Sequence, residues 1–196
     1  MPELIVDFIT SLDGYASAEG WPGWWGLEGP EYLAWLEEQE QDYSVLMGAN
    51  TYRLMYGFAS QASELDAEEG ESMDALTRMP KVVFSATLDE PLEWANSRLV
   101  RGDAVEAVTA MKRDGVKMST IGSLSLCRSL LEAGLVDRFR VGIFPVITGK
   151  TGRERIYDDY PDVALEMIEH RTFDGRIQLV EYKPRVLEHP QLGAPA

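Results

Sequence analysis

The sequence predicts an α/β protein with one mainly parallel sheet, helices on both faces, and an antiparallel strand pair at one edge. Strand-like apolar runs alternate with helix-like segments as far as about residue 134, and strand-like segments alone complete the chain. With 196 residues, of which 45% are hydrophobic, the chain can bury a full core without disulfide or metal support. We therefore expect a single domain over residues 1–183 and a polar, proline-containing tail over residues 184–196.

The composition restricts the partners and the chemistry. A formal net charge of −15 argues against nucleic acid and anionic membranes, because both bind basic surfaces. Cys127 is the only cysteine, and the two histidines, His170 and His189, lie far from any matching cluster. We therefore expect no disulfide, no metal site and no Ser-His-Asp triad. No apolar run reaches the roughly 20 residues of a membrane helix, and no signal-peptide pattern opens the chain, which favours the cytoplasm.

The first half of the chain contains three expected strands, at residues 4–9, 43–47 and 81–84. A helix is expected from Pro30 to about residue 41, because proline suits a first helical turn and apolar residues then recur at helical spacing. A short helix is expected at 52–56. The acidic run over 59–74 is typical of a solvated loop or a loose helix.

The second half alternates again before it ends in strands. We expect a short strand at 99–100, a helix that starts near Asp103 and stops at Gly115, a strand at 117–121, and a helix over 124–134. A strand at 137–145 leads into a glycine-rich loop at 148–152. The last two strands are expected at 164–169 and 176–182, where apolar residues alternate.

Three of the expected strands end in turns of small and hydroxyl-bearing residues. These turns are Gly48-Ala49-Asn50-Thr51, Ser85-Ala86-Thr87 and Ile121-Gly122-Ser123-Leu124. Backbone N–H groups at the start of a helix attract phosphate, and the carboxyl ends of parallel strands meet at one edge of a sheet. Each turn alone also fits a plain turn. Together they predict one long phosphate-bearing ligand, such as a dinucleotide, across that edge, although no G-x-G-x-x-G follows the first strand.

The loop at residues 21–26 contains three tryptophans. Rings at this density either cap the core or wall a pocket for a flat ligand. We take Trp21 and Trp25, together with Trp35 and Phe144, as candidates for the substrate side of a site.

The ordered motifs resemble the dihydrofolate reductase superfamily, and in detail its branch with the reductase domain of riboflavin biosynthesis. The matching segments are Ser11-Leu12-Asp13-Gly14 and residues 47–52, 83–88, 121–124, 131–137 and 145–149, in the family's order from residue 3 to about 183. The resemblance implies a three-layer αβα fold and an NADPH-dependent reductase of a small flat heterocycle, pterin- or pyrimidine-like. It also suggests a homodimer, whose surface could come from the apolar strand at 141–144 unless one subunit buries that strand.

The resemblance also implies roles for individual residues. The Gly48 turn with Thr51, and residues 122–124, would hold the pyrophosphate of the cofactor. Residues 85–87 would lie near its adenosine end. The loop from Asp13 to Trp25 would match the mobile loop that closes over nicotinamide and substrate.

Two positions depart from the family pattern on the ligand side. Ala49 stands where an arginine usually pairs with the 2′-phosphate of NADPH, so NADH is a second candidate cofactor, unless Arg53, Arg101 or Lys81 substitutes. Met55 stands where the riboflavin-pathway reductase has an aspartate, which argues against that particular substrate.

The proton donor is a third departure. By spacing from the Gly48 motif, the carboxylate of dihydrofolate reductases falls on Tyr32, next to Glu31. Glu31 fits a dipole-favouring residue of a first turn equally well, and Asp13 fits the turn-forming aspartate of Asp-Gly. Asp13, Glu31, Tyr32 and water are therefore the candidate donors. Because the cofactor carries the hydride chemistry, this gap does not exclude an enzyme, and the alternative is a non-catalytic nucleotide- or ligand-binding relative.

Overall fold

The computed structural model describes residues 2–21, 25–39, 42–61 and 67–188. Within them an eight-stranded sheet has the order β5-β4-β3-β6-β1-β7-β10-β9. Its strands are β1 (Leu4–Ser11), β3 (Ser44–Gly48), β4 (Lys81–Phe84), β5 (Ser97–Val100), β6 (Met118–Thr120), β7 (Arg138–Phe144), β9 (Val163–Phe173) and β10 (Ile177–Val186). Neighbours from β5 to β7 are parallel, and β10 is antiparallel to both β7 and β9. The predicted mainly parallel sheet with an antiparallel edge is confirmed.

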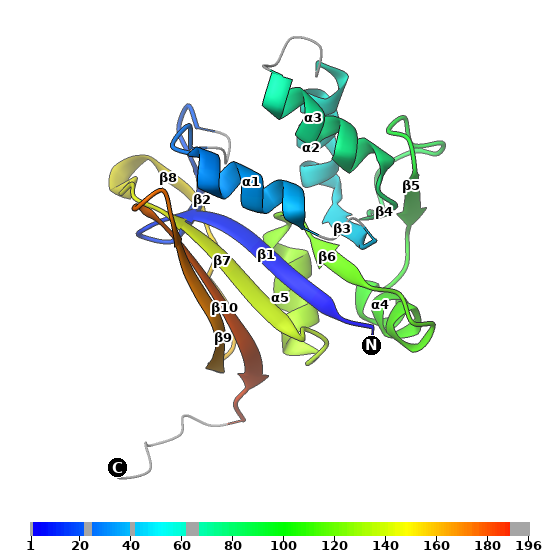
Figure 1. Ribbon diagram of the computed structural model, residues 1–196. Coiled ribbons are helices and arrows are strands. Elements are labelled where there is room, and N and C mark those ends of the chain that lie inside the picture. The colour runs from blue at the N-terminus through cyan, green and yellow to red at the C-terminus, as the bar shows by residue number, and fades with distance from the viewer. Residues whose placement is uncertain (1, 22–24, 40–41, 62–66, 189–196) are drawn as a thin grey trace.

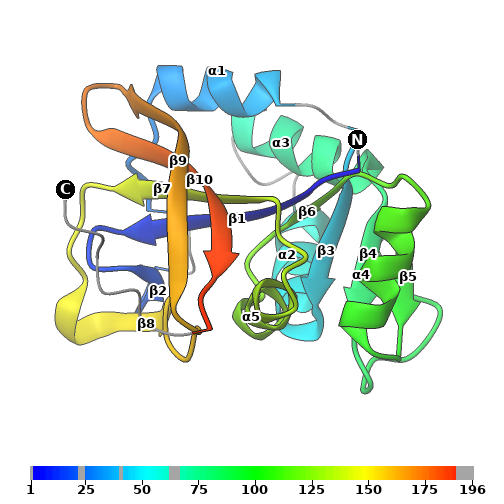
Figure 2. The ribbon, with the colours of Figure 1, turned by 90° about the horizontal axis from the view of Figure 1, so that it is seen from below.

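Helices cover both faces of this sheet (Figure 1). They are α1 (Pro30–Glu38), α2 (Ala49–Ser60), α3 (Ala67–Arg78), α4 (Ala104–Arg113) and α5 (Leu124–Glu132), and a 3-10 turn, η2, spans Gly149–Thr151. The view in Figure 2 places α1 and α3 on one side of the sheet and α4 and α5 on the other. The chain therefore forms the three layers that the resemblance implied.

Strand alternation divides the core between the two faces. On β1, Leu4, Val6 and Phe8 pack with α4 and α5 in one apolar cluster. On the opposite face, α1 covers one part of the sheet through Trp35 and its aromatic neighbours. The helices α2 and α3 cover another part of that face, where they pack on Met47. The two groups of helices stand apart on the same face, and the candidate site lies between them.

The acidic segment is more regular than predicted. Of the two alternatives, a loop or a loose helix, the structure agrees with the helix: α2 runs on to Ser60 and α3 is a regular helix, while residues 62–66 lie outside the described residues. Met73 and Leu76 of α3 pack on the core three residues apart, whereas Glu71 and Asp74 are exposed. Glu71 and Asp74 therefore lie on the solvent side of a helix whose apolar side packs on the core.

Three other expectations need correction. The first helix ends at Glu38 rather than near residue 41, and residues 40–41 are not described. A small antiparallel sheet of β2 (Tyr15–Ala18) and β8 (Gly152–Arg155) was not predicted, because four-residue strands carry little alternation. The last strand does not stop at residue 182 but runs to Val186, so the start of the expected tail belongs to the sheet. Pro184 is tolerated there because the pairing of β10 with β7 ends at Tyr182.

The strand proposed as a dimer surface lies inside the sheet. β7 pairs with β1 on one side and β10 on the other, and Val141 and Phe144 are buried. Burial within one subunit, the alternative explanation, accounts for its apolar sequence. Within the described residues, no helix is both long and apolar enough to cross a membrane.

Candidate active site

A cleft of about 1790 Å³ lies over the sheet, between α1 on one side and α2 with α3 on the other. Pockets for a single small molecule are usually about 300–1,000 Å³, so this one has room for a cofactor and a substrate together. Its floor comes from alternate residues of β1, of β6 with the residue after it, and of β7, namely Ile5, Asp7, Ile9, Ser119, Ile121, Arg138, Arg140 and Gly142. Its walls include Tyr32 and Trp35 on α1 and Thr51 and Met55 on α2.

Two of the three predicted turns are joined directly at one end of this cleft. β3 and β6 are neighbours, so the turns that follow them meet. The N–H of Gly48 donates to Ser123 Oγ at 2.8 Å, and Ser123 Oγ donates to Thr51 Oγ1 at 2.8 Å. Gly122 and Ser123 have φ angles of 52° and 64°, which bring the chain back toward Thr51. A Cβ on Gly122 would lie 3.5 Å from Thr51 Oγ1.

This junction is also where α2 and α5 begin. Gly48 has no side chain to cap α2, and the Ser123 hydroxyl is turned toward Thr51 and not toward its own helix. Among the described residues, neither helix start receives a hydrogen bond from its N-cap side chain. Helix N–H groups left without a side-chain acceptor form an anion site. The residues present therefore fit a pyrophosphate group.

The third turn lies one strand further out, after β4. Ser85 Oγ accepts from the N–H groups of Thr87 and Leu88 at 3.1 and 3.2 Å, which stabilises the turn itself. Ala86 and Thr87 are exposed, and the turn does not border the cleft. Because β3 and β4 are neighbouring parallel strands, this turn lies beside the Gly48 turn. The far end of a long ligand bound at the Gly48 turn would reach it.

The three candidate cations for a 2′-phosphate differ in accessibility. Lys81 is buried, and its ammonium donates to three backbone carbonyls at the end of α3 at 2.8–3.0 Å. Lys81 therefore caps a helix and is unable to substitute for the missing arginine. Arg53 and Arg101 are exposed. Arg53 contacts the Asn50 side chain at 3.4 Å, and Arg101 holds the turn after β4 through the Leu88 carbonyl at 2.7 Å.

Asp13 is a turn residue. Its carboxylate accepts from the N–H groups of Gly149 at 2.7 Å and Thr148 at 3.2 Å. Desolvation acts to raise its pKa, but hydrogen bonds from Ser11 and from these N–H groups outweigh it and lower the pKa to about 2. Asp13 is therefore ionised near neutral pH and does not border the cleft, so the turn interpretation describes it and the proton-donor hypothesis does not.

Glu31 points away from the cleft. Its carboxylate accepts from the N–H of Asp174, in the turn between β9 and β10, at 2.6 Å. Asp174 in return accepts from the N–H groups of Glu31 and Tyr32 at 3.1 and 3.2 Å. The two acids cap the start of α1 reciprocally, in the manner of a capping box built across two elements. A proton donor at Glu31 would have no access to a ligand in the cleft.

Tyr32 is the one proposed donor that borders the cleft. Its ring is buried, and it packs edge-on against Phe144 and Phe173. Burial raises the pKa of its hydroxyl, and the nearby Asp7 carboxyl raises it further. The phenol therefore stays neutral.

The proposed substrate-side aromatics separate into two groups. Trp35 borders the cleft, and its ring lies 5.3 Å from the guanidinium carbon of Arg140. Trp25 and Phe144 are buried with Tyr32 in the core and do not border the cleft, a position that agrees with the packing interpretation. Trp21 is 41% exposed and contacts the Trp25 ring, away from the cleft lining. Trp24 lies outside the described residues.

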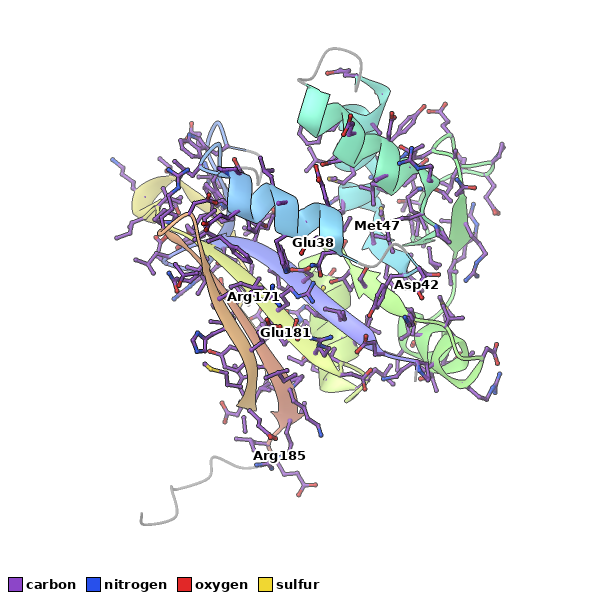
Figure 3. All side chains as sticks on the ribbon, in the orientation of Figure 1. Glu38, Asp42, Met47, Arg171, Glu181 and Arg185 are labelled. Carbon is purple, nitrogen blue, oxygen red and sulfur yellow. The ribbon has the colours of Figure 1, made fainter. Side chains whose placement is uncertain are left out.

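A row of charges at the cleft floor was not predicted from the sequence. Asp7, Arg140 and Glu181 are cross-strand partners on β1, β7 and β10. Arg140 Nε donates to Glu181 at 2.7 Å, and Arg138 also pairs with Glu181, which is 1% exposed. Figure 3 shows Glu181, with Arg171 from the next strand beside it, on this part of the sheet. The sequence does contain a sign of this row: Asp7 is a single acid inside an otherwise apolar strand, and Arg138 and Arg140 occupy alternate positions of a later strand.

Asp7 titrates in an unusual range. Desolvation at the bottom of the cleft raises its pKa to about 6, although the Arg140 charge and hydrogen bond oppose the shift. No group of three or more His, Cys, Asp and Glu side chains that could hold a metal ion occurs in the described residues.

The fold and this cleft define a dihydrofolate reductase-like α/β protein. Residues 2–179 match the model of the RibD C-terminal domain, and the chain belongs to that family. Membership indicates an oxidoreductase.

Individual relatives agree with this family. The chain is 27% identical to the uncharacterized protein YyaP of Bacillus subtilis over 179 residues, which cover 90% of this chain and 93% of YyaP. A putative riboflavin biosynthesis protein from Shewanella sp. PV-4 has a similar structure, with a TM-score of 0.69, 20% identity, and coverage of 93% of this chain and 99% of that one. A pyrimidine reductase-like protein from Corynebacterium diphtheriae gives a TM-score of 0.65, 17% identity, and coverage of 94% and 92%.

A two-activity protein shares the fold over part of its length. It is the diaminohydroxyphosphoribosylaminopyrimidine deaminase/5-amino-6-(5-phosphoribosylamino)uracil reductase of Thermotoga maritima. The TM-score is 0.63 at 16% identity, and the match covers 94% of this chain and 57% of that one. At this level of identity the likeness supports the fold.

Proposed function

We propose that the protein is a reductase that uses NADPH or NADH to transfer a hydride to a small flat heterocycle of the pyrimidine or pterin kind. The observation that carries this proposal is the hydrogen-bonded junction of the turns after β3 and β6, where α2 and α5 begin at one end of a large cleft. Family membership and the reductase names of the C. diphtheriae and T. maritima proteins support the substrate class.

The residues of the cleft would act mainly by positioning. The N–H groups of Ala49, Asn50 and Thr51 at the start of α2, with Gly122 and Ser123, would hold the pyrophosphate and direct the nicotinamide over the sheet. When bound, the reduced nicotinamide supplies the hydride. Trp35 and Tyr32 would support the flat face of the substrate and keep water from it. Met55 gives the opposite wall an apolar side chain, which favours a substrate other than the riboflavin intermediate.

The preference for NADPH or NADH would depend on exposed arginines. Ala49 lies at the start of α2 and offers no charge, while Arg53 lies one turn further along the same helix. A 2′-phosphate at this edge would pair with Arg53 or Arg101.

We also propose that the protein forms a homodimer through β9, which ends the sheet. Leu165, Met167 and Ile168 of this strand are 47%, 53% and 49% exposed. Large apolar side chains on a terminal strand favour pairing with a second copy.

A titration of NADPH and NADH against tryptophan fluorescence tests the proposed reductase. We expect saturable binding of at least one cofactor by the wild-type protein, and loss of binding in Thr51→Tyr, whose ring would fill the junction. Thr109→Tyr on the exposed face of α4 is the matched control and should bind normally. No binding of either cofactor at millimolar concentration would remove the proposal.

Turnover assays then separate an enzyme from a non-catalytic relative. Pterins, pyrimidines and quinone-like acceptors would be added to the cofactor complex, and cofactor oxidation followed by absorbance. Oxidation with one class of acceptor supports a reductase. Stoichiometric cofactor binding without oxidation across the panel would instead favour the non-catalytic alternative.

A further inference from the structure

Asp7 occupies a central place on the cleft floor that the proposed function has not used. It lies in the middle of β1, and its side chain shares the cleft face with Ile5 and Ile9. Of its side-chain surface, 35% is accessible, so a ligand in the cleft can reach the carboxyl. Next to Ile9, across the strand pair, Gly142 adds no side chain to the floor, and a Cβ there would lie 3.7 Å from the Tyr32 hydroxyl oxygen.

The charges around Asp7 leave its carboxyl incompletely paired. Arg140 directs Nε to Glu181 at 2.7 Å, and the contact from Arg140 Nη1 to Asp7 Oδ2 is longer, at 3.4 Å. The same Nη1 also lies 3.3 Å from Gln39 Oε1. Among the described residues, no hydrogen bond reaches Asp7 Oδ1 from another side chain. A carboxylate can accept several hydrogen bonds, so Asp7 has capacity to spare for a ligand.

Other titratable groups interact with Asp7 from the neighbouring elements, on the cleft face and, for Cys127, from the opposite side of the sheet. Arg140 on β7 favours the carboxylate, whereas Glu181 on β10 disfavours it. Tyr32 on α1 and Cys127 on α5 are both kept neutral by burial, and the Asp7 charge contributes to this. Among the described residues Arg140 is the cation that pairs with Asp7, and it also pairs with Glu181. A cationic or N–H-bearing ligand would therefore complete the pairing of Asp7.

We propose that Asp7 is a catalytic residue, which binds a basic ring nitrogen of the substrate and donates the proton that accompanies the hydride. This inference rests on the proposed function. The substrate is then a nitrogen heterocycle with a C=N bond. Hydride from the reduced nicotinamide adds to carbon, the Asp7 proton adds to nitrogen, the C=N double bond becomes a single bond, and the oxidised cofactor and the Asp7 carboxylate remain. Water in the cleft returns a proton to Asp7.

Binding of 2,4-diaminopyrimidine to the full-length protein tests this role without turnover. Calorimetry in two buffers with different ionisation enthalpies measures the protons taken up on binding, at a pH where the free probe is mostly neutral. We expect the wild type to take up about one proton, because the probe binds as a cation on the Asp7 carboxylate. Asp7→Asn should abolish the uptake and weaken binding about tenfold or more, as expected for a charge-assisted hydrogen bond.

Controls separate a binding role from a folding defect. Asp162→Asn, at an exposed acid ahead of β9, should match the wild type. Uracil, which lacks the basic edge, should show no proton uptake. In the wild type alone, affinity for the probe should fall as the pH is lowered through about 6, where the Asp7 carboxylate takes up a proton, so the inference can be tested even if Asp7→Asn folds poorly.

Each result bears on the inference in a defined way. Proton uptake that depends on Asp7, in a protein that also binds NADPH or NADH, supports it. Equal binding of the probe by the wild type and Asp7→Asn, or no binding of the probe by the wild type, overturns the inference. If the same protein binds a cofactor normally, the proposed reductase function still stands. Failure of both cofactors to bind overturns the inference and the proposed function together.

Discussion

Replacing Ser123 with alanine removes the hydroxyl that joins the two turns of the candidate cofactor site. Ser123 Oγ accepts from the Gly48 N–H and donates to Thr51 Oγ1, both at 2.8 Å. Each hydrogen bond contributes about 0.5–1.5 kcal/mol net, so the substitution should lower the free energy of unfolding by about 1–3 kcal/mol. For a chain of this size, about 2–4 °C of melting temperature corresponds to each kcal/mol. The expected decrease is therefore about 2–12 °C.

Differential scanning calorimetry measures this decrease, and a cofactor titration of the same variant measures its effect on binding. We expect weaker cofactor binding as well, because the Ser123 hydroxyl no longer joins Gly48 and Thr51 and the two helix starts lose their fixed relative position. Ser129→Ala, on the exposed side of the same helix, is the matched control and should change neither quantity. An unchanged melting temperature and unchanged cofactor affinity in Ser123→Ala would refute the structural role assigned to the junction.

Three further predictions concern other parts of the chain. The pKa of Asp7 is raised from 3.8 to about 6 in the folded protein. The folded state therefore binds the proton more tightly than the unfolded state, and the free energy of unfolding falls as the pH rises from about 4 to about 6. Urea titrations across this range should show a flatter pH dependence of stability for Asp7→Asn than for the wild type, and the same pH dependence in both proteins would contradict the assignment. Asp174→Ala removes the acceptor for two N–H groups of α1 and should cost about 0.5–2 kcal/mol in chemical denaturation, whereas no loss would exclude the cap. Met167→Glu places a charge on the terminal strand and should convert the proposed dimer into a monomer in light scattering, and a wild-type monomer would dismiss that dimer.

The sheet could be predicted because its signals are local. Continuous apolar runs mark the parallel strands, and each glycine or serine turn follows directly in sequence. The same locality explains why the two joined turns were found: strand order brings Gly48 and Ser123 together once the parallel sheet is assumed. The small β2–β8 sheet and the length of α3 were missed because their apolar signal covers only a few residues.

The charged floor could not be predicted in the same way. Asp7 and Arg140 are 133 residues apart in sequence, and they meet only through the register of β1 and β7. The environment of Lys81 was not predicted either. A lysine at the start of a strand suggests an exposed charge that could pair with a 2′-phosphate, but its ammonium caps the buried end of α3. The Asp7–Arg140 contact depends on strand register at long sequence separation, which a single sequence does not specify. The Lys81 contacts are local, to carbonyls within five residues, but they depend on where α3 ends and β4 begins.

A crystal structure of the protein soaked with NADPH tests the central claim most directly. We predict the pyrophosphate at the junction of Gly48, Thr51 and Ser123, within hydrogen-bond distance of the first N–H groups of α2 and α5, with the nicotinamide over the cleft floor near Asp7. A cofactor bound elsewhere on the molecule, with this junction empty, would contradict the account.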